Sequence, residues 1–193
     1  MSNTRQSSVE FLRVLLMFSI VLEHCLLAAY GGSNNAAFDI NGIIARLLTC
    51  FCYPAVNVLV LISGYFTIGS RSGRFLKFRK LSRLYIQMLF YTILLPLLFL
   101  FFSLNQTEIH LTKLLPIKSD TYWFMTEYFK LMLISPFLVH MVESLDKKWY
   151  LILLSILFIL TVVINIKGTL YGYSLISFVF LFLTAGYLKI YRP

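Results

Sequence analysis

Long apolar stretches without ionisable residues alternate with short polar connections along the chain. Four stretches contain no Asp, Glu, Lys, Arg or His: residues 47–70, 84–107, 149–166 and 168–188. At about 1.5 Å of rise per helical residue, each can cross or nearly cross a hydrocarbon core of roughly 30 Å. The pattern predicts a membrane-spanning helix in each of these stretches.

Two further apolar segments carry ionisable residues inside them. Residues 11–30 hold Arg13, Glu23 and His24, and residues 122–142 hold Glu127, Lys130 and His140. Ionisable side chains are costly in lipid and usually serve a function there, so these two helices are where a site is predicted. Together the segments predict an all-α fold, a polytopic transmembrane bundle of about six spans that forms one domain over residues 1–193.

The composition excludes several classes of protein. The chain is 59% hydrophobic and 13% charged, whereas a globular domain has about 25% charged residues. A cytosolic enzyme, a disordered tail and a disulfide scaffold are therefore disfavoured. The first apolar segment is interpreted as a retained span and not as a signal peptide, because Glu23 and His24 interrupt it.

The net charge of +9 at pH 7 suggests either a nucleic-acid surface or basic cytoplasmic loops. The connection at 67–83 carries six basic residues and no acidic one, and placing it in the cytoplasm puts 12 of the 17 Lys and Arg residues there. This distribution follows the positive-inside rule. It predicts a multi-pass protein of a cell membrane, typically a bacterial inner membrane, with cytoplasmic termini, surrounding lipid and no nucleic-acid partner.

Arg13 and His24 are predicted to lie on one face of the first helix. Eleven positions separate them, which leaves them about 20° from eclipsed and about 16 Å apart along the axis. Arg13 is then near the cytoplasmic surface with Glu10 one turn away, while His24 lies deep with Glu23 beside it. Arg13 can be an interfacial anchor and His24 a packing residue. The alignment of the two favours a functional pair that faces the bundle interior.

The basic run at 71–83 also has two compatible interpretations. It is the topology signal expected of a cytoplasmic loop. Arg79, Lys80 and Arg83 also open the third predicted helix, where they can converge on the phosphates of an anionic ligand.

In the fourth predicted helix, Trp123, Glu127 and Lys130 share a face. Glu127 and Lys130 can neutralise each other within the helix, with Trp123 as an interfacial aromatic. Alternatively, this face lines an acceptor pocket in which the indole stacks on a sugar. Asn57, Ser63 and Gly64 form a stripe of amide and small residues that is typical of close helix packing.

The three cysteines lack the spacing of a metal site. Cys25, Cys50 and Cys52 lie in apolar segments without a CxxC motif, so they are interpreted as packing residues and no metal is predicted.

Four short motifs, taken in order, resemble the acyltransferase family 3 membrane proteins. The first is Ser-Val-Glu-Phe-Leu-Arg-Val-Leu at 8–15 with His24 after it, and the second is the apolar stretch 56–66, which ends in Ser-Gly-Tyr-Phe. The third is Arg-Lys-Leu-Ser-Arg at 79–83. The fourth is Tyr-Trp-Phe at 122–124, followed by Ser-Pro-Phe-Leu at 135–138.

The resemblance implies transfer of an acetyl group from cytoplasmic acetyl-CoA to a hydroxyl of a cell-surface or secreted carbohydrate, free or lipid-linked. It casts His24 as the essential catalytic histidine and Arg13 as its partner. With it, Glu23 is expected to assist the histidine, and the basic triplet Arg79, Lys80 and Arg83 to hold the phosphates of CoA. Trp123 and Glu127 are expected to bind the acceptor.

This chain departs from the family pattern at two points. Lys80 stands where the family often has the first Arg of an Arg-x-x-Arg motif. Family members also usually have more helices than the six predicted here. The resemblance therefore implies an N-terminal portion of the family fold, truncated at the C-terminus, and a complementary polypeptide that supplies the missing helices. The alternatives are a non-enzymatic exporter or flippase subunit for polysaccharide or lipid-linked sugar, and an inactive fragment.

Overall fold

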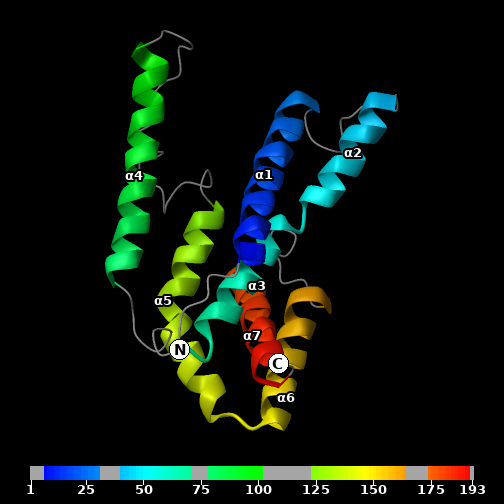
Figure 1. Ribbon diagram of the computed structural model, residues 1–193, viewed down its shortest axis with the longest axis vertical. Coiled ribbons are helices and arrows are strands. Elements are labelled where there is room, and N and C mark those ends of the chain that lie inside the picture. The colour runs from blue at the N-terminus through cyan, green and yellow to red at the C-terminus, as the bar shows by residue number, and fades with distance from the viewer. Residues whose placement is uncertain (1–6, 31–39, 71–77, 102–122, 164–173, 192–193) are drawn as a thin grey trace. The chain divides into compact units, whose positions relative to one another are not determined.

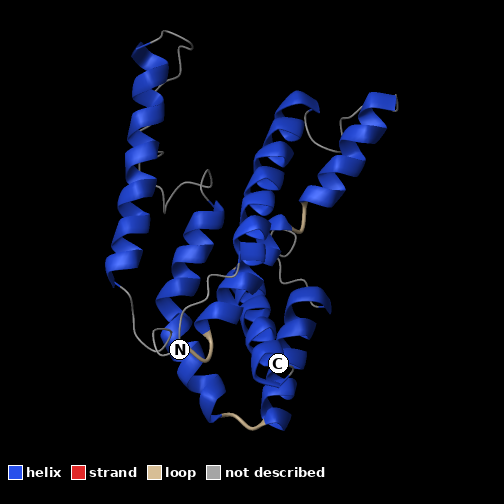
Figure 2. Cartoon of the chain, viewed as in Figure 1, coloured by secondary structure: helices blue, strands red, loops and turns tan. Residues whose placement is uncertain are grey.

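The computed structural model describes residues 7–30, 40–70, 78–101, 123–163 and 174–191, and these are helical apart from short turns (Figures 1 and 2). No strand occurs in these ranges, which confirms the all-α fold. The backbone falls into two compact units, Met1–Ser63 and Gly64–Pro193, each described by itself below.

The first unit contains α1 (Ser7–Tyr30), which packs against α2 (Ile40–Cys52). The buried residues of α2 follow helical spacing and are small or compact: Gly42, Ala45, Thr49 and Cys52. Small residues in one stripe let a helix approach its neighbour closely in a membrane. The Thr49 hydroxyl donates to the Ala45 carbonyl 2.9 Å away, so its only hydrogen-bond donor is satisfied within α2.

Large apolar side chains cover the outside of α1. Phe11, Val14, Phe18 and Val21 are each 60–66% exposed. A helix that presents such residues along its length suits hydrocarbon and not water, because water would order around every one of them. The exposed surface of α1 therefore agrees with the predicted first span.

A proline divides the predicted second span. After α2, Tyr53 and Pro54 form a turn, and α3 (Ala55–Thr67) follows. Proline has no N–H to donate and its ring crowds the preceding turn, yet Tyr53 N still donates to Thr49 O and Val58 N to Pro54 O, both at 3.0 Å. The two helices thus follow each other with one local break, and α3 runs across the boundary of the two units.

The second unit is built around α7 (Leu175–Tyr191), which packs against α5 (Trp123–Ser144) and α6 (Lys147–Phe158). A π-helical turn, η4 (Ile159–Val163), continues α6, and α4 (Phe78–Phe101) contacts α5. Phe178, Phe182 and Leu183 of α7 are fully buried, so α7 carries the core of this unit.

Buried Tyr150 joins α6 to α7. Its hydroxyl donates to the Leu183 carbonyl at 2.8 Å, and its ring meets those of Tyr187 and Tyr191 edge-on at 5.6 and 6.3 Å. Because Tyr150 lies near the start of α6 and Tyr191 ends α7, the two helices are antiparallel. At the opposite end of α7, Phe124 contacts Phe178 at 5.9 Å, so α5 and α7 begin side by side.

The charge-free stretches locate the helices but misplace several starts. The helix predicted from residue 47 begins at Ile40, so Arg46 lies within α2. The helix predicted from residue 84 begins at Phe78. Both errors have one cause: a long basic side chain is compatible with helix and can extend its charge towards water, so charge does not mark the helix end.

Among the described residues, the helical stretches Ser7–Ala29 and Ile40–Thr67 are long and apolar enough to cross a membrane by length and composition, and α7 is a shorter apolar helix. The six spans and the cytoplasmic termini stay predictions. Residues 102–107, 122, 164–166 and 168–173 of the predicted spans lie outside the described residues.

Candidate functional site

The Arg13 guanidinium is held by a carboxylate of its own helix. Arg13 Nη1 lies 2.8 Å from Glu10 Oε1, one turn earlier on α1, as predicted. The two side chains are 40% and 46% exposed, so this pair is screened and contributes little to stability. Its effect is to orient the guanidinium near the start of the helix.

His24 is held in one tautomer by a backbone carbonyl. Its Nδ1 lies 2.8 Å from the carbonyl oxygen of Ile20, one turn earlier. Because a carbonyl oxygen can only accept, Nδ1 carries the hydrogen, and Nε2 of the neutral ring then presents a lone pair. The Ile20 carbonyl therefore occupies the hydrogen-bonding position at Nδ1. The imidazole is thereby prepared to accept a proton at Nε2.

Arg13 and His24 both lie on the uninterrupted helix α1. They therefore share a face about 16 Å apart, too far for direct contact. His24 is exposed, and the neighbouring Glu23 is half-buried. The exposure of His24 differs from the expectation that an ionisable group at depth faces the bundle interior.

The basic triplet lies in the first two turns of α4. Arg79 and Arg83 are exposed and four positions apart, so both point from the same face, and Lys80 is beside them in sequence. Like charges at this spacing destabilise a helix by a few tenths of a kcal/mol. An anion bound between the two guanidinium groups relieves this repulsion, which suits phosphate.

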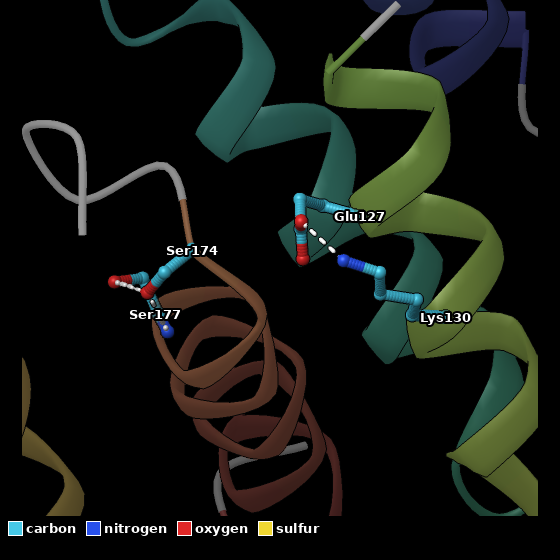
Figure 3. Close-up of polar contacts among 4 residues, drawn as sticks. All are labelled: Glu127, Lys130, Ser174 and Ser177. Atoms are coloured by element: carbon cyan, nitrogen blue, oxygen red, sulfur yellow. Dashed lines mark hydrogen bonds and ion pairs between the residues drawn. The ribbon is translucent and has the colours of Figure 1, made fainter. Parts of the chain in front are cut away.

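The face of α5 that was predicted to carry Trp123, Glu127 and Lys130 holds an ion pair between a mostly buried glutamate and an exposed lysine. Lys130 Nζ lies 2.7 Å from Glu127 Oε1; the lysine side chain is 47% exposed and the glutamate side chain 19% (Figure 3). The carboxylate thus remains inside while the ammonium group extends outward. Trp123 is the first residue of α5, half-buried, with its ring 6.0 Å from that of Phe124.

Two serines lie at the start of α7, and they point away from the Glu127–Lys130 pair (Figure 3). Ser174 Oγ accepts from Ser177 N at 3.3 Å and lies 3.2 Å from Ser177 Oγ (Figure 3). This is a helix N-cap. Sequence reasoning missed these residues because the stretch 168–188 carries no charge. The available signal was a serine three positions before another at the start of an apolar run.

The predicted site residues therefore fall into two sets. His24, Arg13 and Glu23 belong to the first unit, and the basic triplet of α4 with Trp123 and Glu127 belongs to the second. Within the second set, α4 meets α5 through Tyr85 and Phe129, whose rings are 6.2 Å apart. The indole and the carboxylate share α5 itself.

The cysteines behave differently from one another. Cys52 is buried and packs in the first unit, whereas Cys25 and Cys50 are exposed, so the packing interpretation holds only for Cys52. Among the residues that the structure describes, no three His, Cys, Asp or Glu side chains gather as metal ligands. His140 is exposed on α5, and His110 lies outside the described residues.

A family model described as an acyltransferase domain matches residues 6–193. The chain belongs to acyltransferase family 3. Comparisons with curated proteins and with solved structures find no match.

The family match covers nearly the whole chain. The match begins before Arg13 and His24 and includes every predicted site residue. At the level of the family, the match identifies the chain as a membrane-associated acyltransferase. The donor, the acceptor and the roles of individual residues go beyond the match.

Proposed function

We propose that this protein is a membrane O-acetyltransferase that moves an acetyl group from cytoplasmic acetyl-CoA to a hydroxyl of a cell-surface or secreted carbohydrate. The single observation that carries the proposal is His24 on α1, whose Nδ1 is bonded to the Ile20 carbonyl and whose Nε2 is thereby left as a base. Family membership supplies the reaction class.

His24 acts as the general base in this proposal. Nε2 takes the proton of the acceptor hydroxyl while that oxygen attacks the thioester carbonyl of the donor. The carbon–sulfur bond breaks, and CoA leaves as a thiolate that recovers the proton from the imidazolium.

The cationic groups serve the donor. Arg79 and Arg83 are exposed at one end of α4, and a guanidinium binds phosphate oxygens in pairs. Lys80 contributes a point charge without that fork. Arg13, oriented by Glu10 at 2.8 Å, is placed on the donor side of His24.

Trp123 and Glu127 serve the acceptor. An indole ring can stack on the apolar face of a sugar, and the largely buried Glu127 carboxylate can accept hydrogen bonds from sugar hydroxyls. Lys130 already holds one of its oxygens at 2.7 Å. A carboxylate has about four acceptor positions, so capacity for a ligand remains.

We also propose that further helices, supplied by a complementary polypeptide, cover His24. The exposed imidazole supports this, because general-base catalysis in a membrane works best where lipid and bulk water are excluded.

The test is His24→Ala with His140→Ala as the matched control, since His140 is exposed on α5 and outside the proposed site. Membranes that contain each variant are incubated with labelled acetyl-CoA and acceptor polysaccharide. We expect His24→Ala to lower acetyl transfer by roughly 10²- to 10⁴-fold and His140→Ala to leave it unchanged.

Unchanged transfer in His24→Ala would overturn the catalytic assignment. A normal acetyl content together with less polymer at the cell surface would favour an exporter or flippase subunit. Activity that appears only when the complementary polypeptide is co-expressed would show that the chain alone is an inactive fragment.

A further inference from the structure

A groove runs along the seam between α6 and α7, which lie side by side (Figure 1). Its volume is about 400 Å³, within the usual range of ligand sites in proteins. Its walls come from both helices. α6 contributes Leu151, Leu154, Ser155 and Phe158, and α7 contributes Phe180 and Thr184.

The hydroxyl donors of this α6–α7 groove are already satisfied. Ser155 Oγ donates to the Leu151 carbonyl at 2.9 Å, and Thr184 Oγ1 donates to the Phe180 carbonyl at 2.8 Å. The other lining side chains are apolar, and the rings of Phe158 and Phe180 lie 6.0 Å apart. A hydrocarbon chain suits this lining, because excluding water leaves no donor without a partner.

The length of the groove matches one leaflet of a bilayer. The groove extends along α6 from Leu151 to Ile159, which is about 12 Å of helix rise. Half of a hydrocarbon core is about 15 Å thick. The groove ends where the regular α-helix ends, because Ile159 is the first residue of the π-helical turn η4. A chain held here therefore lies within a single leaflet.

Two lysines extend the face of the groove to the start of α6. Lys147 precedes Leu151 by four positions, and Lys148 precedes Ser155 by seven, so both lysines share a helix face with the groove. Both are exposed, and neither makes an ion pair in the part of the chain that the structure describes. Lys147 Nζ lies 5.5 Å from the centre of the Tyr191 ring, at the α7 side of the same seam.

The other charged groups near this end do not cancel the two lysines. Asp146 is the exposed N-cap residue of α6, and its side chain makes no capping bond, so positions 146–148 carry a net charge of +1. Lys189 lies on the other side of α7 from Phe180, where its Nζ donates to the Ile68 carbonyl at 2.7 Å beside Gly69. Lys147 and Lys148 therefore supply the positive charge at the mouth of the groove.

We propose that the α6–α7 groove binds one anionic phospholipid of the cytoplasmic leaflet. The phosphate lies between Lys147 and Lys148, and one acyl chain lies in the groove from Leu151 to Ile159. Charge complementarity selects the headgroup, and the apolar lining selects the chain. A topology signal requires lysines only somewhere in a loop, whereas these two stand on the face of the groove. The site is independent of the proposed acetyl transfer.

The first experiment tests the headgroup. The full chain in neutral detergent is titrated with phosphatidylglycerol, or with phosphatidylcholine that has the same acyl chains, and bound lipid is counted by native mass spectrometry. We expect one phosphatidylglycerol to bind about 25-fold more tightly than phosphatidylcholine, or about fivefold for each lysine. Salt should reduce this preference.

The matched variants remove charge at and away from the groove. The double variant Lys147→Gln, Lys148→Gln should bind phosphatidylglycerol no more tightly than phosphatidylcholine. Lys130→Gln removes an exposed lysine of α5 and should retain the preference of the wild type.

The second experiment tests the acyl chain. Thr184→Phe places a ring in the groove from α7, Ser155→Phe does so from α6, and Ile190→Phe adds a ring to an exposed position of α7 outside the groove. The first two should weaken phosphatidylglycerol binding about tenfold at a thermal midpoint close to that of the wild type, and Ile190→Phe should not. Glycerol phosphate, which has no acyl chain, should bind at least 100-fold more weakly than phosphatidylglycerol.

Equal affinity of the wild type for the two phospholipids would overturn the proposal. Undiminished phosphatidylglycerol binding in both Thr184→Phe and Ser155→Phe would also overturn it, because the chain would then lie elsewhere. A dimer without bound lipid that dissociates in Thr184→Phe would make a second copy of the chain the occupant and exclude the lipid site.

Discussion

At the scale of single residues, the packing of the second unit depends on glycines at positions where any larger side chain would clash with a neighbouring helix. Gly64 of α3 lies so close to α7 that a Cβ would be 2.5 Å from the Phe182 carbonyl oxygen. The sequence stripe of Asn57, Ser63 and Gly64 predicted close packing, and this is confirmed at Gly64. Asn57 is half-buried, and its Oδ1 has no hydrogen-bond partner among the described residues.

Gly64→Ala should therefore destabilise the protein. In an ordinary helix this change is stabilising by roughly 0.5–1 kcal/mol. Here the new methyl group meets backbone that cannot move aside cheaply, and the cost of overpacking is about 1–3 kcal/mol. Thermal unfolding in detergent measures the sign. A raised midpoint would show that α3 and α7 are not packed this closely.

Glu127→Gln tests whether the ion pair on α5 is only structural. An ion pair with one exposed member contributes about 0.2–1 kcal/mol, so a purely structural pair predicts only a small stability cost for either substitution. If Glu127 also binds the acceptor, Glu127→Gln should raise the acceptor KM severalfold while Lys130→Met changes it little. Steady-state kinetics with varied acceptor measures this, and equal effects of the two substitutions would contradict the binding role.

At the scale of elements, α5 crosses a proline without breaking. Pro136 lies inside the helix and is buried, and it cannot donate to the Met132 carbonyl four positions earlier. The Ser135 hydroxyl donates to that carbonyl instead, at 2.9 Å. Serine and threonine side chains satisfy freed carbonyls in this way in membrane helices. Ser135 therefore replaces the hydrogen bond that Pro136 cannot make.

Ser135→Ala should cost about 1 kcal/mol, because the Met132 carbonyl then remains buried without its donor. Ser155→Ala is the control: Ser155 is exposed on α6, and its hydroxyl bonds a carbonyl within an uninterrupted helix at 2.9 Å. The midpoint of thermal unfolding should fall for Ser135→Ala and hardly move for Ser155→Ala. The same small shift in both variants would show that the Ser135 hydroxyl does not replace the hydrogen bond lost at Pro136.

Helices could be predicted from the sequence more reliably than their ends. The apolar segments identified α5, α6 and α7 within a few residues over the described ranges, because side chains that contact lipid are predominantly apolar. The early starts of α2 and α4 could not be read this way, because Arg46 and Arg79 are compatible with helix. The break at Pro54 corresponds to a proline between apolar residues in the sequence, which favours a helix boundary.

At the scale of the whole molecule, the composition predicted the all-α class and family motifs predicted the reaction class. The contacts that define the second unit could not be predicted. Tyr150 bonds the backbone of Leu183, and Lys189 bonds that of Ile68. Such bonds join side chains to carbonyls, and every residue has a carbonyl, so periodicity and charge give no signal of the partner. The tautomer of His24 was hidden for the same reason, because Ile20 contributes only its carbonyl.

The bond between Lys189 and Ile68 joins positions 121 residues apart, and this separation has a consequence during synthesis. A ribosome adds roughly 5–20 residues per second, so the end of α3 emerges about 6–24 s before the residue that will hold it. During that interval Gly64 and Gly69 are exposed without their α7 partners. The nascent chain then needs either the lipid or the insertion machinery to shield this helix end. The order of translation therefore makes α7 the element that completes the unit.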